Sequence, residues 1–473
     1  MITRLFSIGF MIFCIAGCST LAPDYIRPGP PIPAEWPQGM AYKDTQAEPE
    51  ALAVRELSRQ AFFADEPMQK IIEMALDNNR DLRLAALNVE RARALYGIQR
   101  AELFPVVNAT AVGSRESVPA STFGDIGRDL GSLRTEKYSV GLGIAAWEID
   151  FFGRIQSLKD QALEEYLATD EARRSAQIAL VSEVARVYLI LGADRKNLKL
   201  AEFTLETQQA AYDLIRRQTE VGLGTELDLR QAQIPVETAR RDLARFTQMI
   251  AQDRNALNLL AGSAVPEKFL PADLASVHPP KEIFPGLSSE ELLNRPDIMA
   301  AEHQLKGAYA FIGAARAAFF PQISLTTSIG TASDELSGLF GSGSGTWSFT
   351  PQVAVPVFDA RTWAAYRVSK AQKEIALAQY EKTIQSAFRE VADVLAVRGM
   401  VDQQISAQQS LTDAIAVTYR LADKRYQKGI DSYLGVLDAQ RSLYFQQRVL
   451  TGLQLEKLVN QVRLYAVLGG GGE

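Results

Sequence analysis

Few residues in this sequence have the chemistry of an active site. The 473 residues include two cysteines, Cys14 and Cys18, and two histidines, His278 and His303. Because both cysteines lie near the amino terminus, the rest of the chain has neither a disulfide framework nor a cysteine metal site. Two histidines make a histidine metal cluster or a catalytic triad implausible. These residue types disfavour an enzyme.

Acidic residues outnumber basic ones, 56 to 50, which gives a net charge of −6. This balance argues against a basic, nucleic-acid-binding surface. The carboxylate pairs Glu164-Glu165 and Glu290-Glu291 have no histidine near them in the sequence. We therefore expect both pairs to be solvated, and we expect neither a bound cofactor nor a metal site.

Cys18 is the residue with the clearest chemistry. Residues 1–17 have the pattern of a signal peptide, in which Arg4 precedes an apolar stretch too short for a transmembrane helix. The tetrad Ile15-Ala16-Gly17-Cys18 resembles the bacterial lipobox, which implies a mature chain that begins at Cys18 with N-acyl and S-diacylglycerol lipid. Ser19 follows the cysteine, and by resemblance to bacterial lipoproteins the absence of an aspartate at this position favours sorting to the outer membrane. Ordinary cleavage that leaves Cys18 as a free thiol is the alternative.

The sequence contains two copies of one plan. The segment Asn79–Pro105 resembles Arg295–Pro321, and both end in Phe-Pro. Such self-similarity indicates tandem structural repeats. The predicted organisation is a signal peptide (1–17), a lipid-anchored, proline-rich arm that acts as a tether or a wrapping arm (18–64), a first repeat (65–262), a linker or equatorial segment (263–288), a second repeat (289–468) and a flexible tail (469–473).

Each copy contains one very long predicted helix. No proline interrupts residues 156–222 or 362–429, so each helix extends for roughly 100 Å at 1.5 Å per residue. Apolar residues follow a heptad spacing, which predicts coiled-coil packing. The seam of the first copy is Leu180, Val184, Val187, Leu191, Leu198, Ala201, Leu205, Tyr212 and Ile215, and that of the second is Leu377, Tyr380, Ile384, Ala387, Val391, Val394, Val401 and Ile405.

Two strands are expected in each copy, with apolar residues on one face and small or polar residues on the other. The clearest alternations are at residues 138–145 and 323–330, and loops are expected at 114–137 and 331–346. An apolar outer face is typical of a membrane barrel, whereas a soluble sandwich is the alternative. Four strands do not close a barrel, and open edges are excluded from lipid, so several chains must share one barrel.

These features together resemble the outer-membrane efflux protein family, the TolC-like channels, and within it the lipid-anchored OprM-like branch. The residues that carry the resemblance are Phe104-Pro105, Phe320-Pro321, Trp147–Gly153, Pro356–Asp359, Val221–Leu223 and Leu437–Gln440. The resemblance implies a mainly α fold with a membrane β-barrel portion, in which a trimer forms a twelve-stranded barrel continued by a twelve-helix coiled-coil tunnel. It also implies a Gram-negative outer-membrane location, extension into the periplasm, and docking to a periplasmic membrane-fusion adaptor and an inner-membrane pump of the RND type.

The family pattern also implies roles for residues at the two helical hairpin tips. Asp228 and Tyr426 match members of a linking pair at a periplasmic gate, and Asp431 and Asp438 lie at the second tip, where Asp438 matches an acid that lines the aperture. The adaptor would dock at the turns, which comprise Gly222, Leu223, Gly224, Thr225, Gly429, Ile430 and Ser432. Capping explains Asp228 equally well, because Thr225 precedes it by three residues. A surface ion pair with Arg425 or Lys424 is the alternative for Asp438.

We therefore predict a passive export duct for small molecules, gated at its periplasmic tip and without enzymatic activity. A lipid-anchored periplasmic coiled-coil adaptor or scaffold is the second hypothesis. The residues do not indicate the cargo, the particular pump and adaptor, or the resting state of the gate.

Overall fold

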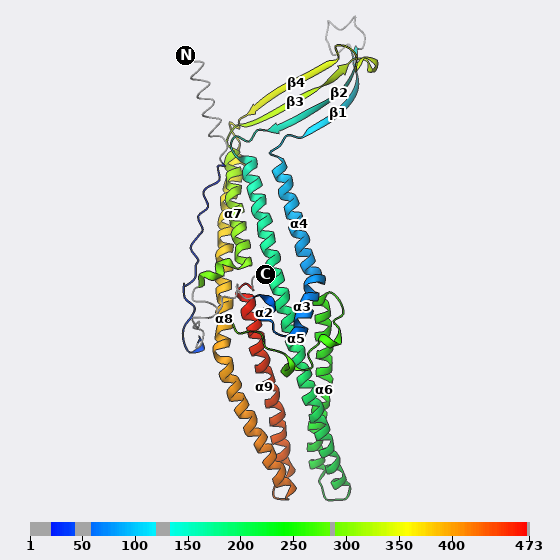
Figure 1. Ribbon diagram of the computed structural model, residues 1–473, viewed down its shortest axis with the longest axis vertical. Coiled ribbons are helices and arrows are strands. Elements are labelled where there is room, and N and C mark those ends of the chain that lie inside the picture. Colours follow the sequence, from blue (N-terminus) through cyan, green and yellow to red (C-terminus); the bar gives the residue numbers. More distant parts are fainter. Residues whose placement is uncertain (1–19, 43–57, 120–132, 284–288, 471–473) are drawn as a thin grey trace. The chain divides into compact units, whose positions relative to one another are not determined.

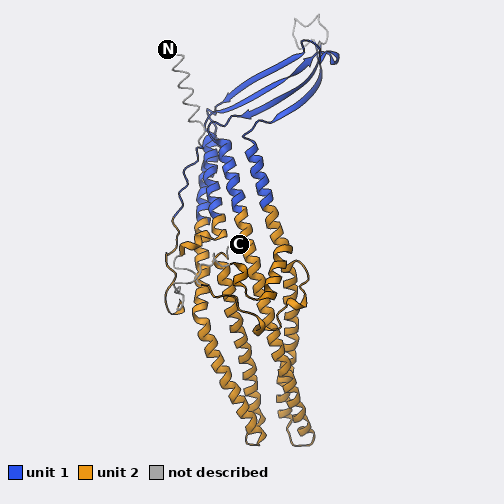
Figure 2. Cartoon of the chain, viewed as in Figure 1, with its two compact units in different colours: residues 1–28, 89–168, 301–379 blue, residues 29–88, 169–300, 380–473 orange. Residues whose placement is uncertain are grey.

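The computed structural model describes residues 20–42, 58–119, 133–283 and 289–470. The chain divides into two compact units (Figure 2): unit 1 comprises Met1–Pro28, Val89–Ala168 and Ala301–Gln379, and unit 2 comprises Gly29–Asn88, Thr169–Ala300 and Tyr380–Glu473. Cys18 and the signal peptide lie outside the described residues, as do part of the predicted arm (43–57) and of the predicted tail (471–473).

The described elements repeat one order, as predicted (Figure 1). The first copy consists of α4 (Arg80–Ala101), β1 (Val107–Val118), β2 (Leu133–Glu148), α5 (Arg154–Glu220) and α6 (Glu226–Ala261). The second consists of α7 (Pro296–Ala317), β3 (Gln322–Ser333), β4 (Gly345–Ala354), α8 (Ala360–Gln427) and α9 (Tyr433–Val467). The remaining elements are α2 (Arg59–Phe62), α3 (Glu66–Asn78) and the short 3-10 helices η1 (Met40–Tyr42), η4 (Glu267–Phe269), η5 (Leu274–Ser276), η6 (Ser289–Asn294) and η7 (Leu336–Gly338).

The four strands form one antiparallel sheet in the order β1-β2-β3-β4. The register places Leu142, Ile329 and Trp347 in one row across three strands. All three side chains are exposed, Trp347 by 79%. Ser328 and Ser348 pair in the next row, with 2.7 Å between their hydroxyl oxygens. One face is therefore apolar and unburied, as expected for strands that face lipid.

Among the described residues of this chain, β1 and β4 are the edges of the sheet and have no further strand partner. Pro351 lies on the edge strand β4, a position that tolerates the missing N–H. The predicted loop boundaries were wrong, because β1 continues to Val118, β2 begins at Leu133, β3 continues to Ser333 and β4 begins at Gly345. Backbone pairing continues into these polar stretches, where the sequence has no apolar alternation to indicate it.

The long helices have the predicted lengths, 67 residues in α5 and 68 in α8. The predicted heptad seams are confirmed in unit 2, where Val184, Leu191, Ile384 and Val391 are fully or almost fully buried. One window of α5 is apolar enough to cross a membrane, but 56% of it is buried inside the fold, as is usual for a core helix.

Residues 20–42 of the arm pack against the fold, so the wrapping alternative holds for them. In unit 1 the hydroxyls of Thr20 and Ser157 are 2.6 Å apart, and Arg316 donates to the Leu21 carbonyl at 3.0 Å. Gly313 has no room for a Cβ atom, which would lie 2.7 Å from the Ala22 nitrogen. In unit 2 the ring of Trp36 stacks on Phe388. The described residue nearest to Cys18 is therefore held by side-chain contacts.

Candidate functional site

The candidate site comprises the tips of two helical hairpins, α5–α6 and α8–α9, which end in the same backbone motif. The φ angles of Gly222 and Gly429 are 80° and 70°, in the left-handed region that glycine adopts without strain. The Gly222 N–H donates to the Thr219 carbonyl and the next N–H to the Gln218 carbonyl; the bonds around Gly429 are equivalent. Both turns are therefore Schellman motifs.

The residue after each glycine is apolar and exposed. Leu223 is 82% exposed and Ile430 is 57% exposed, and Val221 adds a further exposed side chain beside Leu223. Gly224 lies close to the helix end, since a Cβ atom on it would meet the Thr219 hydroxyl at 2.8 Å. Each tip therefore presents an apolar side chain to its surroundings on a turn of defined geometry.

Asp228 forms a capping box with Thr225 at the start of α6. The Asp228 N–H donates to the Thr225 hydroxyl at 3.1 Å, and the Thr225 N–H donates back to the Asp228 carboxylate at 3.2 Å. Ser432 occupies the corresponding position before α9, but its side chain makes no cap hydrogen bond. The structure thus gives Asp228 a local structural role, and its role in a gate stays a prediction.

Tyr426 lies against Tyr433, with 4.9 Å between the ring centroids. Burial raises the pKa of Tyr433, and the neighbouring Tyr419 and Tyr426 add to the shift. Within one chain, the hydrogen bonds that the structure describes do not join Tyr426 to Asp228. The predicted linking pair is therefore not formed inside a single protomer.

The two acids of the second tip each pair with an arginine. Asp431 accepts a hydrogen bond from Arg425 at 3.1 Å, and this contact lowers the pKa of the Asp431 carboxyl. Asp438 accepts from Arg441 at 2.8 Å. The suggested partners of Asp438, Arg425 and Lys424, were wrong, because Arg425 is engaged by Asp431 and Arg441 lies one turn along the same helix. Asp438 is more than half exposed.

A buried polar contact between the two hairpins involves Asp242, which the sequence analysis did not identify. Asp242 on α6 is 1% exposed and accepts hydrogen bonds from Tyr444 at 3.1 Å and Arg448 at 3.0 Å, both on α9. Burial, together with the Asp242 charge, raises the pKa of Tyr444 to about 12. The sequence signal was an acid within the buried face of α6, between Ala239 and Phe246. This triad joins the two copies of the repeat.

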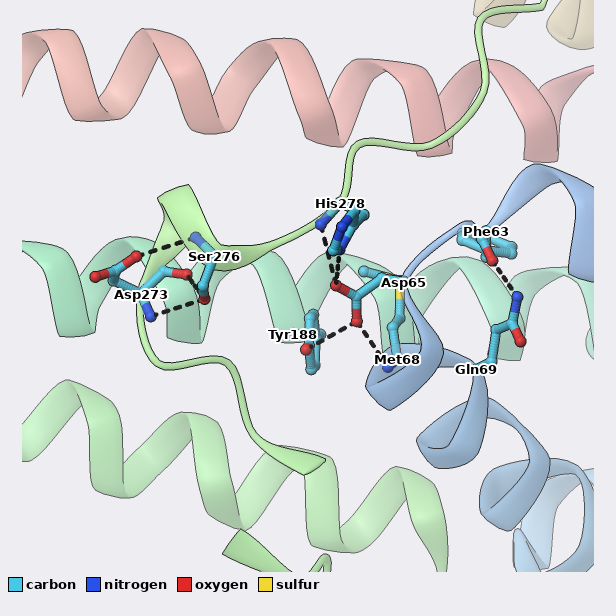
Figure 3. Close-up of polar contacts among 8 residues, drawn as sticks. All are labelled: Phe63, Asp65, Met68, Gln69, Tyr188, Asp273, Ser276 and His278. Atoms are coloured by element: carbon cyan, nitrogen blue, oxygen red, sulfur yellow. Dashed lines mark hydrogen bonds and ion pairs between the residues drawn. The ribbon is translucent and has the colours of Figure 1, made fainter. Parts of the chain in front are cut away.

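A second buried carboxylate, Asp65, holds the linker to the helical core (Figure 3). Asp65 is 2% exposed, caps α3 through the Met68 N–H, and accepts bonds from the Tyr188 hydroxyl and the His278 N–H, each at 3.0 Å. Burial and the carboxylate raise the pKa of Tyr188 above its ordinary value. His278 donates its backbone N–H to Asp65, and its largely exposed ring also lies with Nδ1 3.8 Å from Oδ2 of Asp65.

The expectation that Glu164 is merely solvated was wrong. His303 on α7 lies with its Nδ1 2.6 Å from Oε2 of Glu164 on α5, a contact over 139 residues that the sequence does not indicate. Both side chains are mostly buried. Across the ranges that the structure describes, no group of three or more His, Cys, Asp or Glu side chains is arranged to hold a metal ion.

Comparisons with known proteins agree on one family. A family model described as outer membrane efflux protein matches residues 71–263 and 287–470. The toluene efflux pump outer membrane protein TtgC of Pseudomonas putida is 48% identical over 479 residues, covering 100% of this chain and 96% of TtgC. The outer membrane protein OprJ of Pseudomonas aeruginosa is 41% identical over 98% of this chain and 95% of its own length.

A solved structure shows the same fold. The open state of the MtrE outer membrane channel of Neisseria gonorrhoeae superposes with a TM-score of 0.85 at 35% identity, covering 96% of this chain and 98% of MtrE.

Proposed function

This chain belongs to the outer membrane efflux protein family, and from that premise we propose that three copies form a passive duct whose periplasmic hairpin tips carry the gate. It is an outer-membrane channel component of an efflux system. The observation that carries the proposal is the open four-stranded sheet, which has an exposed apolar face and, in the part of the chain that the structure describes, two unpaired edges. Lipid excludes open edges, so strands of other copies must complete the barrel.

Partners and cargo are part of the proposal. A periplasmic adaptor would contact the exposed Leu223 and Ile430 at the tips, and an inner-membrane pump of the RND type would supply the energy. TtgC is named for toluene efflux. By analogy, we propose that the cargo of this chain consists of small apolar organic molecules. The adaptor or scaffold hypothesis is set aside, because the matched relatives and structures are outer membrane proteins.

Conductance tests the duct and the aperture acid together. The mature protein in planar lipid bilayers is expected to form discrete channels that divalent cations block from the periplasmic side. Asp438→Ala should weaken this block by up to about fivefold, since an exposed ion contact contributes little. Arg441→Gln, which removes the counter-ion of Asp438, should strengthen it. If the protein formed no channels, the proposed duct would be refuted. If divalent-cation block were the same in both variants as in the wild type, Asp438 would not line the aperture.

A pair of variants separates gating from capping at Asp228. Thr225→Ala and Asp228→Ala both remove the capping box, a loss of about 1 kcal/mol at the start of α6. Only Asp228→Ala also removes a link to Tyr426 of a neighbouring protomer. We expect Asp228→Ala and Tyr426→Ala to raise the leak conductance and Thr225→Ala to leave it unchanged. Equal leak in Asp228→Ala and Thr225→Ala would assign Asp228 to capping alone.

Lipid attachment at Cys18 is also part of the proposal. It is supported by the lipobox tetrad Ile15-Ala16-Gly17-Cys18. Cys18→Ser is expected to abolish incorporation of radiolabelled palmitate, while the chain stays in the outer membrane through its barrel. Cys14→Ser, within the signal peptide, is the matched control and should retain the label. Palmitate labelling of Cys18→Ser would contradict the assignment.

A further inference from the structure

A cavity of about 240 Å³ lies between the two hairpins in unit 2. Its apolar wall consists of Ile234 and Pro235 on α6 and Leu434 and Leu437 on α9, and Gln208 on α5 closes one side. An apolar cavity of about 150 Å³ is sufficient for benzene. The cavity therefore has room for a bicyclic aromatic molecule.

Gln208 provides a hydrogen-bond acceptor that the protein leaves unused. Its side chain is 2% exposed, and its buried Oε1 has no hydrogen-bond partner in the described part of the chain. Buried polar atoms are normally paired, and leaving one unpaired costs about 1–3 kcal/mol. A ligand that donates one hydrogen bond would remove this cost.

Pro235 adds a second acceptor to the same cavity. Because proline has no N–H, the backbone carbonyl of Gln231, one of the residues that line the cavity, lacks its usual donor within α6. The charged Asp438 and Arg441 at the cavity are paired with each other, and the neutral Tyr444 hydroxyl donates to Asp242. Oε1 of Gln208 is an uncharged acceptor, which favours a neutral donor over an ion.

We propose that this cavity is a binding site for a small, neutral, bicyclic aromatic molecule with one N–H or O–H donor, of the indole or naphthol kind. The ring system packs between Pro235 and Leu437, and the donor reaches the Oε1 atom of Gln208. The site lies in the wall between two hairpins and is additional to the duct of the proposed function.

Binding there stabilises the arrangement in which α6 and α9 are adjacent. The cavity is lined from both helices, so a movement that separates them removes the site. A molecule that binds only the adjacent arrangement shifts the equilibrium toward it by mass action. The ligand therefore acts on hairpin movement, independently of whether it is also cargo.

The test uses 5-bromoindole soaked into crystals of the full mature protein, where the bromine is located by anomalous scattering. We expect a bromine peak between Pro235 and Leu437 in the wild type and none there in Leu437→Trp, which fills the cavity. A peak only elsewhere, or ordered water alone in the cavity at saturating 5-bromoindole, would overturn the proposal.

Affinity measurements test the donor. Saturation-transfer NMR on protein in one detergent compares indole with benzothiophene, which has the same shape but no N–H. Gln208→Leu should weaken indole binding by roughly two- to tenfold, the range of one hydrogen bond, and leave benzothiophene unaffected. Gln403→Leu, at an exposed glutamine of α8, is the matched control and should change neither. Equal loss of both compounds in Gln208→Leu would refute the role of Oε1.

Discussion

Asp242→Ala is expected to lower the free energy of unfolding of the helical region by about 3 kcal/mol, and to increase the mobility of the two hairpins relative to each other. The reason is the burial of Asp242, whose carboxylate is the acceptor for Tyr444 and Arg448. Removing it leaves the Arg448 guanidinium, itself about three-quarters buried, without its counter-ion on α6. The midpoint of thermal unfolding, followed by far-UV circular dichroism in detergent, measures the loss.

Glu237→Ala is the matched control for Asp242. Glu237 lies on the same helix and pairs with Arg240, but both side chains of that pair are about half exposed. Exposed pairs contribute at most about 1 kcal/mol, so this variant should unfold near the wild-type temperature. Asp242→Asn, which keeps an acceptor for Tyr444 but loses the charge, should be intermediate. If Asp242→Ala and Glu237→Ala were equally stable, the contacts of Asp242 with Tyr444 and Arg448 would not contribute to the stability of the fold.

Asp65→Ala is expected to destabilise the same region by roughly 3–5 kcal/mol, because three contacts are lost together. The variant loses the cap of α3 and leaves the buried Tyr188 hydroxyl and the His278 N–H without an acceptor. The linker around His278 should then detach from the core. Thermal unfolding measures the stability, and limited proteolysis measures the accessibility of the linker.

Asp273→Ala provides the control for Asp65, since Asp273 caps the short helix η5 in the same linker (Figure 3). Its cap bonds with Ser276 are local and exposed, and its ion pair with Lys199 on α5 is partly exposed. We expect a loss of at most about 1 kcal/mol and no new cleavage near His278. Tyr188→Phe removes one donor to Asp65 and leaves the N–H groups of Met68 and His278 in place. It should lower the free energy of unfolding by about as much as Asp273→Ala. If the linker of Asp65→Ala were cleaved no faster than that of the wild type, other contacts would hold the linker.

Local and periodic features of the molecule follow from the sequence by itself. The lengths of α5 and α8 are determined by long heptad patterns without proline. The turns at Gly222 and Gly429 are determined by the one residue type that adopts positive φ without strain. The alternation in β2 and β3 determines which face of the sheet is apolar. Each of these depends on neighbours within a few residues, so composition and spacing are sufficient to predict it.

Long-range pairings were decided only by the tertiary structure. Asp242 meets Arg448 over 206 residues and Asp65 meets His278 over 213, and neither pair has a local pattern that selects the partner. The same is true of Glu164 and His303, and of the cavity beside Gln208. The depth of burial of a polar side chain depends on which helix packs against it. Burying a carboxylate among apolar side chains costs free energy unless hydrogen-bond donors pair with it. In these cases the donors come from a distant part of the chain.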